Sequence, residues 1–325
     1  MVMGGAGFIG RHVVTALLGH GHQVVVGSRR PDSASRRLGA AASVCERRTV
    51  RFERLLEAGR WAPLLDGIAV AINCAGILRE RGAETYHAVH VAAPVALAHA
   101  CRERGIRFLH VSALGLRHPH RSAFLRSKRA AEDLLANSGG DYRLVRPSLL
   151  DGDGGFGARW IRRLARLPLH VLARGANGRI AALEAGDLGE AVARLAMIDI
   201  AADATREQRE FELGGLAPRD IGEYMQALRE QRGLPPARCL RVPAWLARLG
   251  SHGCDLAHFS PFSFGHWELL QQDNMPAPNR LLELLGRPPR GVGAPAAAPT
   301  LSLGSWARPQ ALASSSERSA PWTAQ

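Results

Sequence analysis

The first 150 residues alternate short runs of apolar and β-branched residues with longer amphipathic stretches. The amphipathic stretches have helical periodicity, and an apolar run follows each of them. Strands that are apolar throughout are buried on both faces, and a sheet covered by helices on both faces is parallel. The alternation therefore predicts a doubly wound α/β domain over residues 1–150. The predicted strands are residues 24–26, 49–53, 68–73, 108–112 and 142–146, and the predicted helices are residues 10–18, 86–104 and 124–137.

The pattern loosens after residue 150, and residues 151–290 are predicted to form a smaller C-terminal substrate lobe. Elements between about residues 180 and 215 are predicted to return to the main sheet. From Gly291 onward the chain is rich in Ala, Pro and Ser and has little to bury, which predicts a disordered tail over residues 291–325. The predicted elements of the lobe are helices at residues 160–166, 187–197, 221–231 and 241–249 and a strand at residues 210–213.

Three glycines, Gly4, Gly7 and Gly10, form a G-x-x-G-x-x-G turn at the start of the first β-α-β unit. Such a turn needs glycine where the chain bends tightly, where the backbone approaches a pyrophosphate, and where the helix packs closely on the strand. This context predicts a Rossmann-type dinucleotide site. Only three residues precede Gly4, whereas a central strand normally has five or six. Either the first strand is clipped or the true start lies upstream, and the sequence leaves both open.

The end of the second predicted strand indicates which dinucleotide is bound. An Asp or Glu at this place hydrogen-bonds the 2′-hydroxyl of NAD. Here the chain has Ser28, Arg29 and Arg30 instead, and the first acidic residue is Asp32. Serine and arginine favour a 2′-phosphate, so NADP(H) is favoured over NAD(H). The alternative is that both arginines are only solvated surface residues.

The chain carries 42 Lys and Arg against 29 Asp and Glu, a formal net charge of +13, and Lys128 is its only lysine. The arginines are scattered and no aromatic residues are interleaved with them, so nucleic-acid binding is not expected. No apolar stretch approaches the roughly 20 residues of a membrane span, and no secretory signal precedes the glycine turn. Five cysteines without a CxxC pair are typical of a reducing cytoplasm.

No metal site is expected. The residues His252, Cys254, His258 and His266 are close in sequence, but their spacing matches no zinc pattern.

Several motifs together resemble the short-chain dehydrogenase/reductase superfamily, in its extended or atypical branch of the NAD-dependent epimerase/dehydratase type. A more particular resemblance, to bacterial proteins similar to the NAD(P)H-binding accessory subunit of respiratory complex I, is carried by residues 61–65, 72–79, 89–91, 270–274 and 284–288. The superfamily motifs are residues 4–10, 73–76, 110–115, 127–128, 146–148 and 187–188.

The resemblance implies where chemistry takes place. In this superfamily a Tyr-x-x-x-Lys pair and a serine act on the reacting oxygen, and the lysine also binds the nicotinamide ribose. The matching positions here are Ser112 and Lys128, but Phe124 occupies the position of the tyrosine. The resemblance also implies a set of cofactor-binding residues, namely Gly4, Gly7, Phe8, Ile9, Gly10, Ser28, Arg29, Arg30, Asn73, Ala75, Gly76, Lys128, Arg146, Pro147 and Ser148.

Two functional hypotheses follow, because a phenyl ring has no proton to transfer. In the first, the chain binds the dinucleotide but has weak or altered catalysis. In the second, it is an active NADP(H)-dependent oxidoreductase or epimerase that takes its proton from water, the substrate, or a histidine such as His118 or His120. A nucleic-acid-binding protein is a distant third. The resemblance implies a small-molecule, quinone or respiratory-complex partner, and a cytoplasmic location with peripheral inner-membrane association left open.

Overall fold

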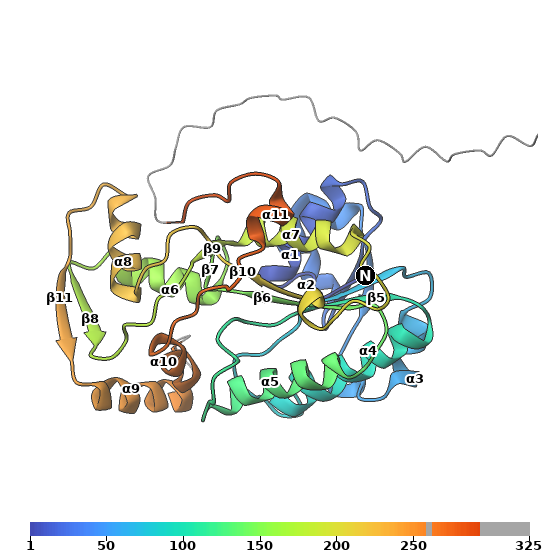
Figure 1. Ribbon diagram of the computed structural model, residues 1–325, viewed down its shortest axis with the longest axis horizontal. Coiled ribbons are helices and arrows are strands. Elements are labelled where there is room, and N and C mark those ends of the chain that lie inside the picture. The colour runs from blue at the N-terminus through green and yellow to red at the C-terminus, as the bar shows by residue number, and fades with distance from the viewer. Residues whose placement is uncertain (258–261, 293–325) are drawn as a thin grey trace, which may run out of the picture. The chain divides into compact units, whose positions relative to one another are not determined.

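The structure is a computed structural model that describes residues 1–257 and 262–292 (Figure 1). Seven strands form one sheet in the order β10-β6-β5-β4-β1-β2-β3, and every neighbouring pair is parallel. The strand order reverses between β1 and β4, which is the switch point where doubly wound sheets bind ligands. The predicted fold class is therefore confirmed. The strands are β1 Val2–Met3, β2 Val25–Ser28, β3 Glu46–Thr49, β4 Val70–Asn73, β5 Arg107–Val111, β6 Tyr142–Pro147 and β10 Glu210–Leu213.

Helices cover both faces of this sheet (Figure 1). On one face, α1, α7 and α11 contribute Val13, Val192 and Leu284 to a buried core. On the other face, Trp61 and Leu97 belong to a second core that includes residues of α3, α4 and α5. The two cores explain why the strands are apolar on both sides. The helices around the sheet are α1 Phe8–Gly19, α2 Pro31–Leu38, α3 Ala58–Trp61, α4 Ala93–Glu103, α5 Ala123–Ala136, α7 Ala185–Met197 and α11 Leu281–Leu285.

Strand β1 has only two residues, yet it pairs on both sides. Val2 lies opposite Val26 of β2 and Ile72 of β4, and the Met1 carbonyl accepts a hydrogen bond of 2.9 Å from the Ile72 amide. Met3 is the last residue of β1 and lies at the carboxyl end of the strand, directly before the glycine turn. The short strand therefore still places Gly4 at the carboxyl end of the sheet.

Two predicted elements differ from those observed. The strand predicted at residues 49–53 is wrong, because β3 ends at Thr49 and Phe52–Arg54 form a 3₁₀ turn. Val50 and Phe52 are buried in the core instead, where the Phe52 ring meets the Trp61 ring at 5.5 Å. The helix predicted at residues 86–104 begins with a wider π-helical segment, His87–Ala92. Pro94, which lacks an N–H for the regular i→i−4 bond, explains the wider turn.

The remaining elements form the C-terminal lobe, which is at the left in Figure 1. Strands β8 and β11 pair in parallel, as do β7 and β9, and none of these four was predicted. The predicted helix at residues 241–249 begins after Pro243, and β11 takes up the residues before it. The elements are β7 Leu150–Asp151, α6 Phe156–Ala165, β8 Leu169–Ala173, β9 Leu183–Glu184, α8 Ile221–Glu230, β11 Arg238–Val242, α9 Ala244–Ala257 and α10 Phe264–Leu270.

The described residues all lie within one compact unit, Met1–Pro295. The boundary at residue 150 between two domains therefore stays a prediction. Of the predicted tail at residues 291–325, only Gly291 and Val292 are described, and Val292 is buried and accepts a hydrogen bond from Arg219. The rest of that tail lies outside the described residues. Among the described residues, no helix is both long and apolar enough to cross a membrane.

Candidate cofactor and active site

The glycine turn is held against the end of β2. The Gly4 amide donates to the Gly27 carbonyl (2.9 Å), and the Gly7 amide donates to the Gly4 carbonyl (2.8 Å). Gly4 has a φ of +68°, and a Cβ at Gly10 would lie 2.3 Å from the Gly4 carbonyl oxygen. Both positions therefore require glycine. Helix α1 starts directly afterwards at Phe8, with no acidic side chain in its first turn, so its free amides form an anion-binding end.

Phe8 and Ile9 follow the turn and have different surroundings. The Phe8 ring lies against the loop between β7 and α6, where a Cβ at Gly155 would come within 2.7 Å of it. Arg11 extends over the same ring, 5.7 Å from its centroid. Ile9 packs on the core beneath α1. Phe8 therefore borders the site with its ring, while Ile9 can meet a cofactor only through its backbone.

The end of β2 presents the residues predicted to select NADP(H). The hydroxyl of Ser28 is buried and has no hydrogen-bond partner in the described part of the chain. Arg29 forms an ion pair with Glu84, donating from Nη1 to Oε2 at 2.5 Å. The guanidinium of Arg30 is exposed and makes no hydrogen bond or ion pair with any described residue. Glu84 was not predicted, because it comes from a distant loop.

The end of β4 carries a second loop of the site. The side-chain oxygen of Asn73 accepts a hydrogen bond from the Ala75 amide (2.9 Å), and its amide nitrogen lies 3.0 Å from Nδ1 of His110. A Cβ at Gly4 would lie 3.0 Å from the Ala75 backbone. The topology thus brings residues 73–76 and the glycine turn, which are far apart in sequence, into contact at the switch point.

His90 links this loop to helix α5, and it was not among the predicted site residues. Its Nε2 accepts from the Ile77 amide (3.0 Å), and its Nδ1 lies 2.9 Å from the Ser127 hydroxyl. Ser127 in turn donates to the Phe124 carbonyl at 2.8 Å. These partners assign the proton of the neutral ring to Nδ1. Burial, with the nearby Lys128 charge, lowers the pKa of His90 to about 2, so the ring stays neutral.

Ser112 directly follows strand β5, and Lys128 lies on helix α5. The Ser112 hydroxyl is buried at the end of β5 without a hydrogen-bond partner among the described residues. Lys128, on α5, has no ion pair within the described ranges. Burial lowers its pKa, and Glu132, one helical turn later, opposes this shift. Within the described chain neither the Ser112 hydroxyl nor the Lys128 ammonium has a hydrogen-bond or ion-pair partner, which suits them to hold a polar ligand.

The Phe124 ring lies among three other rings. Tyr86 and His90 approach it edge-on with centroids at 5.9 and 5.6 Å, and His266 of α10 stacks on it at 6.3 Å. Tyr86 donates its hydroxyl to the Leu78 carbonyl (2.8 Å), so that phenol is engaged elsewhere. No local pattern in the sequence indicates Tyr86 or His266, because both are placed by tertiary packing.

The two loop histidines named as alternative proton donors differ in exposure and in hydrogen bonding. His118 is exposed, whereas Nε2 of His120 lies 2.7 Å from the Gly115 carbonyl oxygen. Its Nδ1 is buried and has no hydrogen-bond partner in the described chain. Neither histidine is among the rings around Phe124.

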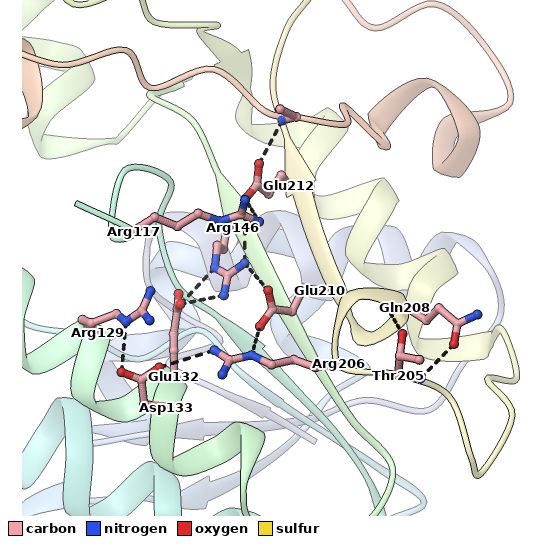
Figure 2. A network of polar contacts seen from close by, with 11 residues as sticks. Arg117, Arg129, Glu132, Asp133, Arg146, Thr205, Arg206, Gln208, Glu210 and Glu212 are labelled. Carbon is pink, nitrogen blue, oxygen red and sulfur yellow. Dashed lines mark hydrogen bonds and ion pairs between the residues drawn. The ribbon is translucent and has the colours of Figure 1, made fainter.

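Arg146 was predicted to bind the cofactor, but the structure uses its guanidinium inside the protein (Figure 2). Its Nε donates to Glu132 at 2.9 Å and its Nη1 to Glu210 at 2.6 Å, and Arg146 and Glu132 are almost fully buried. The Ser148 hydroxyl is also engaged, donating to the Asn274 carbonyl (3.1 Å). The Pro147 carbonyl accepts from the Leu114 amide (3.0 Å). All three residues thus connect β6 to its surroundings, and we leave their side chains out of the proposed cofactor contacts.

Within the described ranges, no three His, Cys, Asp or Glu residues gather as metal ligands would. Of the four residues close in sequence, His258 lies outside those ranges. His266 bonds with Ser263 and His252 stacks on the Phe264 ring.

Comparisons with known proteins agree with this geometry. A ceramide reductase of Caulobacter vibrioides is 33% identical over 156 residues, which are 47% of this chain and 46% of that protein. The match thus spans about half the length of this relative. The NADPH-dependent quinone oxidoreductase of Escherichia coli, solved with NADPH, has a TM-score of 0.65 at 17% identity, covering 90% of this chain and 96% of that chain.

A UDP-glucose-4-epimerase of Stenotrophomonas maltophila with bound NAD has a TM-score of 0.63 at 17% identity, covering 89% of this chain and 93% of that chain. At such identities the two solved structures support the fold alone. The model of the NAD dependent epimerase/dehydratase family matches residues 1–188, more than half of the chain. The protein is therefore an NAD(P)-binding member of the NAD dependent epimerase/dehydratase family.

Proposed function

We propose that this protein binds NADP(H) at the switch point of the sheet and has weak or altered catalysis, because the proton donor of its family is missing. The observation that carries the proposal is that the Ser112 hydroxyl and the Lys128 ammonium have no hydrogen-bond or ion-pair partner among the described residues, whereas the residue at position 124, beside Lys128, is a phenylalanine. These polar groups are suited to bind a cofactor and a substrate oxygen, whereas a phenyl ring cannot exchange a proton. Loss of a positioned general acid typically costs about 10²–10⁴-fold in rate.

Each part of the cofactor has residues suited to hold it. The free amides at the start of α1 suit the pyrophosphate. The buried Ser28 hydroxyl and the Arg30 guanidinium suit a 2′-phosphate, and no acidic residue at the end of β2 selects for the 2′-hydroxyl. Lys128 suits the nicotinamide ribose, and the Ser112 hydroxyl suits a substrate oxygen. When bound, the nicotinamide supplies or accepts a hydride.

A second candidate is an active NADP(H)-dependent carbonyl reductase in which water or the substrate supplies the proton. The unpartnered Ser112 hydroxyl favours it, because a buried polar group without a partner is costly unless a ligand completes it. The relative named as a ceramide reductase also supports a reductase. The resemblance to the complex I accessory subunit remains a prediction, as do a quinone-related partner and peripheral inner-membrane association.

Binding is tested by titrating the protein with NADPH and NADH and measuring the dissociation constants by calorimetry. We expect tighter binding of NADPH, and we expect Gly10→Ala to abolish binding because its Cβ would clash with the Gly4 carbonyl. Gly19→Ala is the matched control, since a Cβ there meets nothing within 4 Å. Lys128→Met should weaken binding of both cofactors without unfolding the chain. Unaltered binding by Gly10→Ala would place the cofactor elsewhere and refute the proposal.

Catalysis is tested on the same preparations with NADPH and a panel of ketones, including long-chain keto-lipids and quinones. Tight binding without turnover supports the first candidate. Turnover of any carbonyl substrate that Ser112→Ala abolishes supports the second candidate.

A further inference from the structure

The outer face of the small sheet in the C-terminal lobe is apolar and exposed. Val171 of β8 pairs with Leu240 of β11, and the exposed fractions of these residues are 60% and 51%. Leu169, two residues before Val171 and thus on the same face, is 46% exposed. On the opposite face His170 is buried and Leu172 packs on the core. The inner face of β8 is therefore covered by the described chain, whereas its outer face is not.

Helix α9 begins two residues after β11, lies next to the small sheet (Figure 1) and also carries exposed apolar side chains. Trp245 and Leu249, four residues apart and hence on one side of the helix, are each 64% exposed. Leu246 beside them is 41% exposed. We call Leu169, Val171, Leu240, Trp245, Leu246 and Leu249 the lobe face.

The segments that carry the lobe face are rich in arginine, and their first acidic neighbour on α9 is Asp255. Residues 154–183 have six arginines and residues 231–254 have four, and neither segment has an Asp or Glu. Among the described residues, the only one of these ten guanidinium groups with a carboxylate partner is that of Arg162. Burial lowers the pKa of Arg232, and the nearby charges of Arg166 and Arg162 lower it further. The two segments that carry the lobe face thus hold nine arginines that have no carboxylate partner among the described residues.

We propose that the lobe face docks on the surface of a membrane that contains anionic phospholipids. Exposed leucines and valine gain free energy by entering the acyl boundary, and tryptophan is favoured at the membrane–water interface. The surrounding arginines bind lipid phosphates and are drawn by the negative surface potential. An anionic membrane binds a protein face that combines apolar side chains with cations. Neither kind of side chain alone would be sufficient for this docking.

Other occupants match the lobe face less well. A second copy in a twofold dimer would bring two positive faces together, and like charges repel. Nucleic acid favours polar and stacking side chains rather than exposed aliphatic ones. The rest of this chain, residues 293–325, has one acidic residue, Glu317, against Arg308 and Arg318, so it cannot neutralise the face.

The lobe face is connected to the candidate site. Asp255 of α9 forms an ion pair with Arg79 (3.5 Å) and accepts from the Phe264 amide at the start of α10. Helix α10 places His266 on the Phe124 ring. Docking through α9 would therefore bring the substrate side of the site near the bilayer, although the docking proposal does not depend on cofactor binding.

The full chain is tested by flotation with vesicles of pure phosphatidylcholine and with vesicles containing about 30% phosphatidylglycerol. We expect binding to the anionic vesicles only, and weaker binding at about 0.5 M salt, where charge attraction is screened. The double variant Trp245→Ser/Leu249→Ser should bind at least about tenfold more weakly. The control Val44→Ser/Leu282→Ser removes two other exposed apolar side chains, outside the lobe face, and should bind like the parent chain.

A second variant, Arg174→Gln/Arg238→Gln, tests the charge without changing the apolar surface and should also weaken binding. NADPH titration of each variant verifies the fold and separates this proposal from the proposed function. Equal binding to neutral vesicles would overturn the proposal, as would equal losses in the lobe-face and control variants. Self-association or RNA binding that Trp245→Ser/Leu249→Ser abolishes, without anionic vesicle binding, would assign the face to those partners instead.

Discussion

The ammonium nitrogen of Lys128 lies 5.7 Å from the centroid of the Phe124 ring, one helical turn earlier on α5. A cation at this distance is attracted by the face of the ring. It would also stabilise a phenolate on the same ring, which is how the family's lysine lowers the pKa of the tyrosine. The Phe124 ring thus lies close to the Lys128 charge but carries no hydroxyl.

Phe124→Tyr is expected to create a phenol whose pKa lies below the ordinary value of about 10, because Lys128 favours its ionised form. An ultraviolet titration of tyrosinate measures this pKa directly. The three native tyrosines do not interfere, since burial raises the pKa of Tyr86, Tyr142 and Tyr224.

Lys128→Met in the same background should remove the low-pKa phenol and serves as the control. Where a carbonyl substrate is found, Phe124→Tyr should raise kcat by about 10²-fold or more. If the new phenol titrates at or above pH 10, Lys128 does not lower the pKa of a tyrosine at position 124, and this prediction is wrong.

Glu84→Gln is expected to tighten NADPH binding by up to about fivefold, because it releases Arg29 and removes a negative charge near the proposed 2′-phosphate position. NADH has no 2′-phosphate, so its affinity should not change. Calorimetric dissociation constants for both cofactors measure the effect. Glu57→Gln removes an exposed carboxylate beside Arg60 and is the control for net charge. An equal change for NADH would show that Glu84 does not act on selectivity.

Arg146→Met is expected to lower the free energy of unfolding by about 3–5 kcal/mol, because Glu132 would remain buried without its partner. The matched control is Arg104→Met. Arg104 pairs with Asp66 at 2.9 Å, but these side chains are 38% and 71% exposed, so its loss should cost at most about 1 kcal/mol. Urea unfolding measures both values. Similar costs for the two variants would mean that burial does not set the strength of the network in Figure 2.

The sequence predicts most of the sheet because apolar residues mark its central strands locally, whereas β3, which is Glu-Arg-Arg-Thr, carries no such signal. Residues 142–146 thus correspond closely to β6, and residues 210–213 to β10. The prediction is wrong at residues 49–53, where Val50 and Phe52 have the alternation of a strand but are buried in a turn. Local pattern does not distinguish these two ways of burying the same side chains.

The sequence predicts only part of the site, because a local pattern does not show which distant segments fold together. Gly4, Gly10, Ser112 and Lys128 belong to motifs in which spacing along the chain indicates the chemistry. Glu84, His90 and His266 do not, because their roles depend on which distant segment folds against them. Arg146 is the reverse case, because the sequence indicates a role for it that its contacts in the structure do not support. Its motif is present, but Glu132 and Glu210 determine what its guanidinium contacts.

Three buried histidines are expected to make stability depend on pH. Burial lowers the pKa of His90, His110 and His266 to about 2, 3 and 4, whereas an unfolded histidine has a pKa near 6.5. Below pH 6.5 the unfolded chain therefore takes up protons that the folded chain does not, and stability falls as pH falls. Each ring contributes a loss of about 1.4 kcal/mol per pH unit until the folded pKa is reached.

Urea unfolding between pH 6.5 and 5 measures this slope above the range in which carboxylates titrate. His110→Gln, which keeps an acceptor for Asn73, should reduce the slope by about 1.4 kcal/mol per pH unit. His118→Gln changes an exposed ring and should leave the slope as it is. If both variants keep the parent slope, His110 is not held neutral by burial, and the lowered pKa assigned to it is wrong.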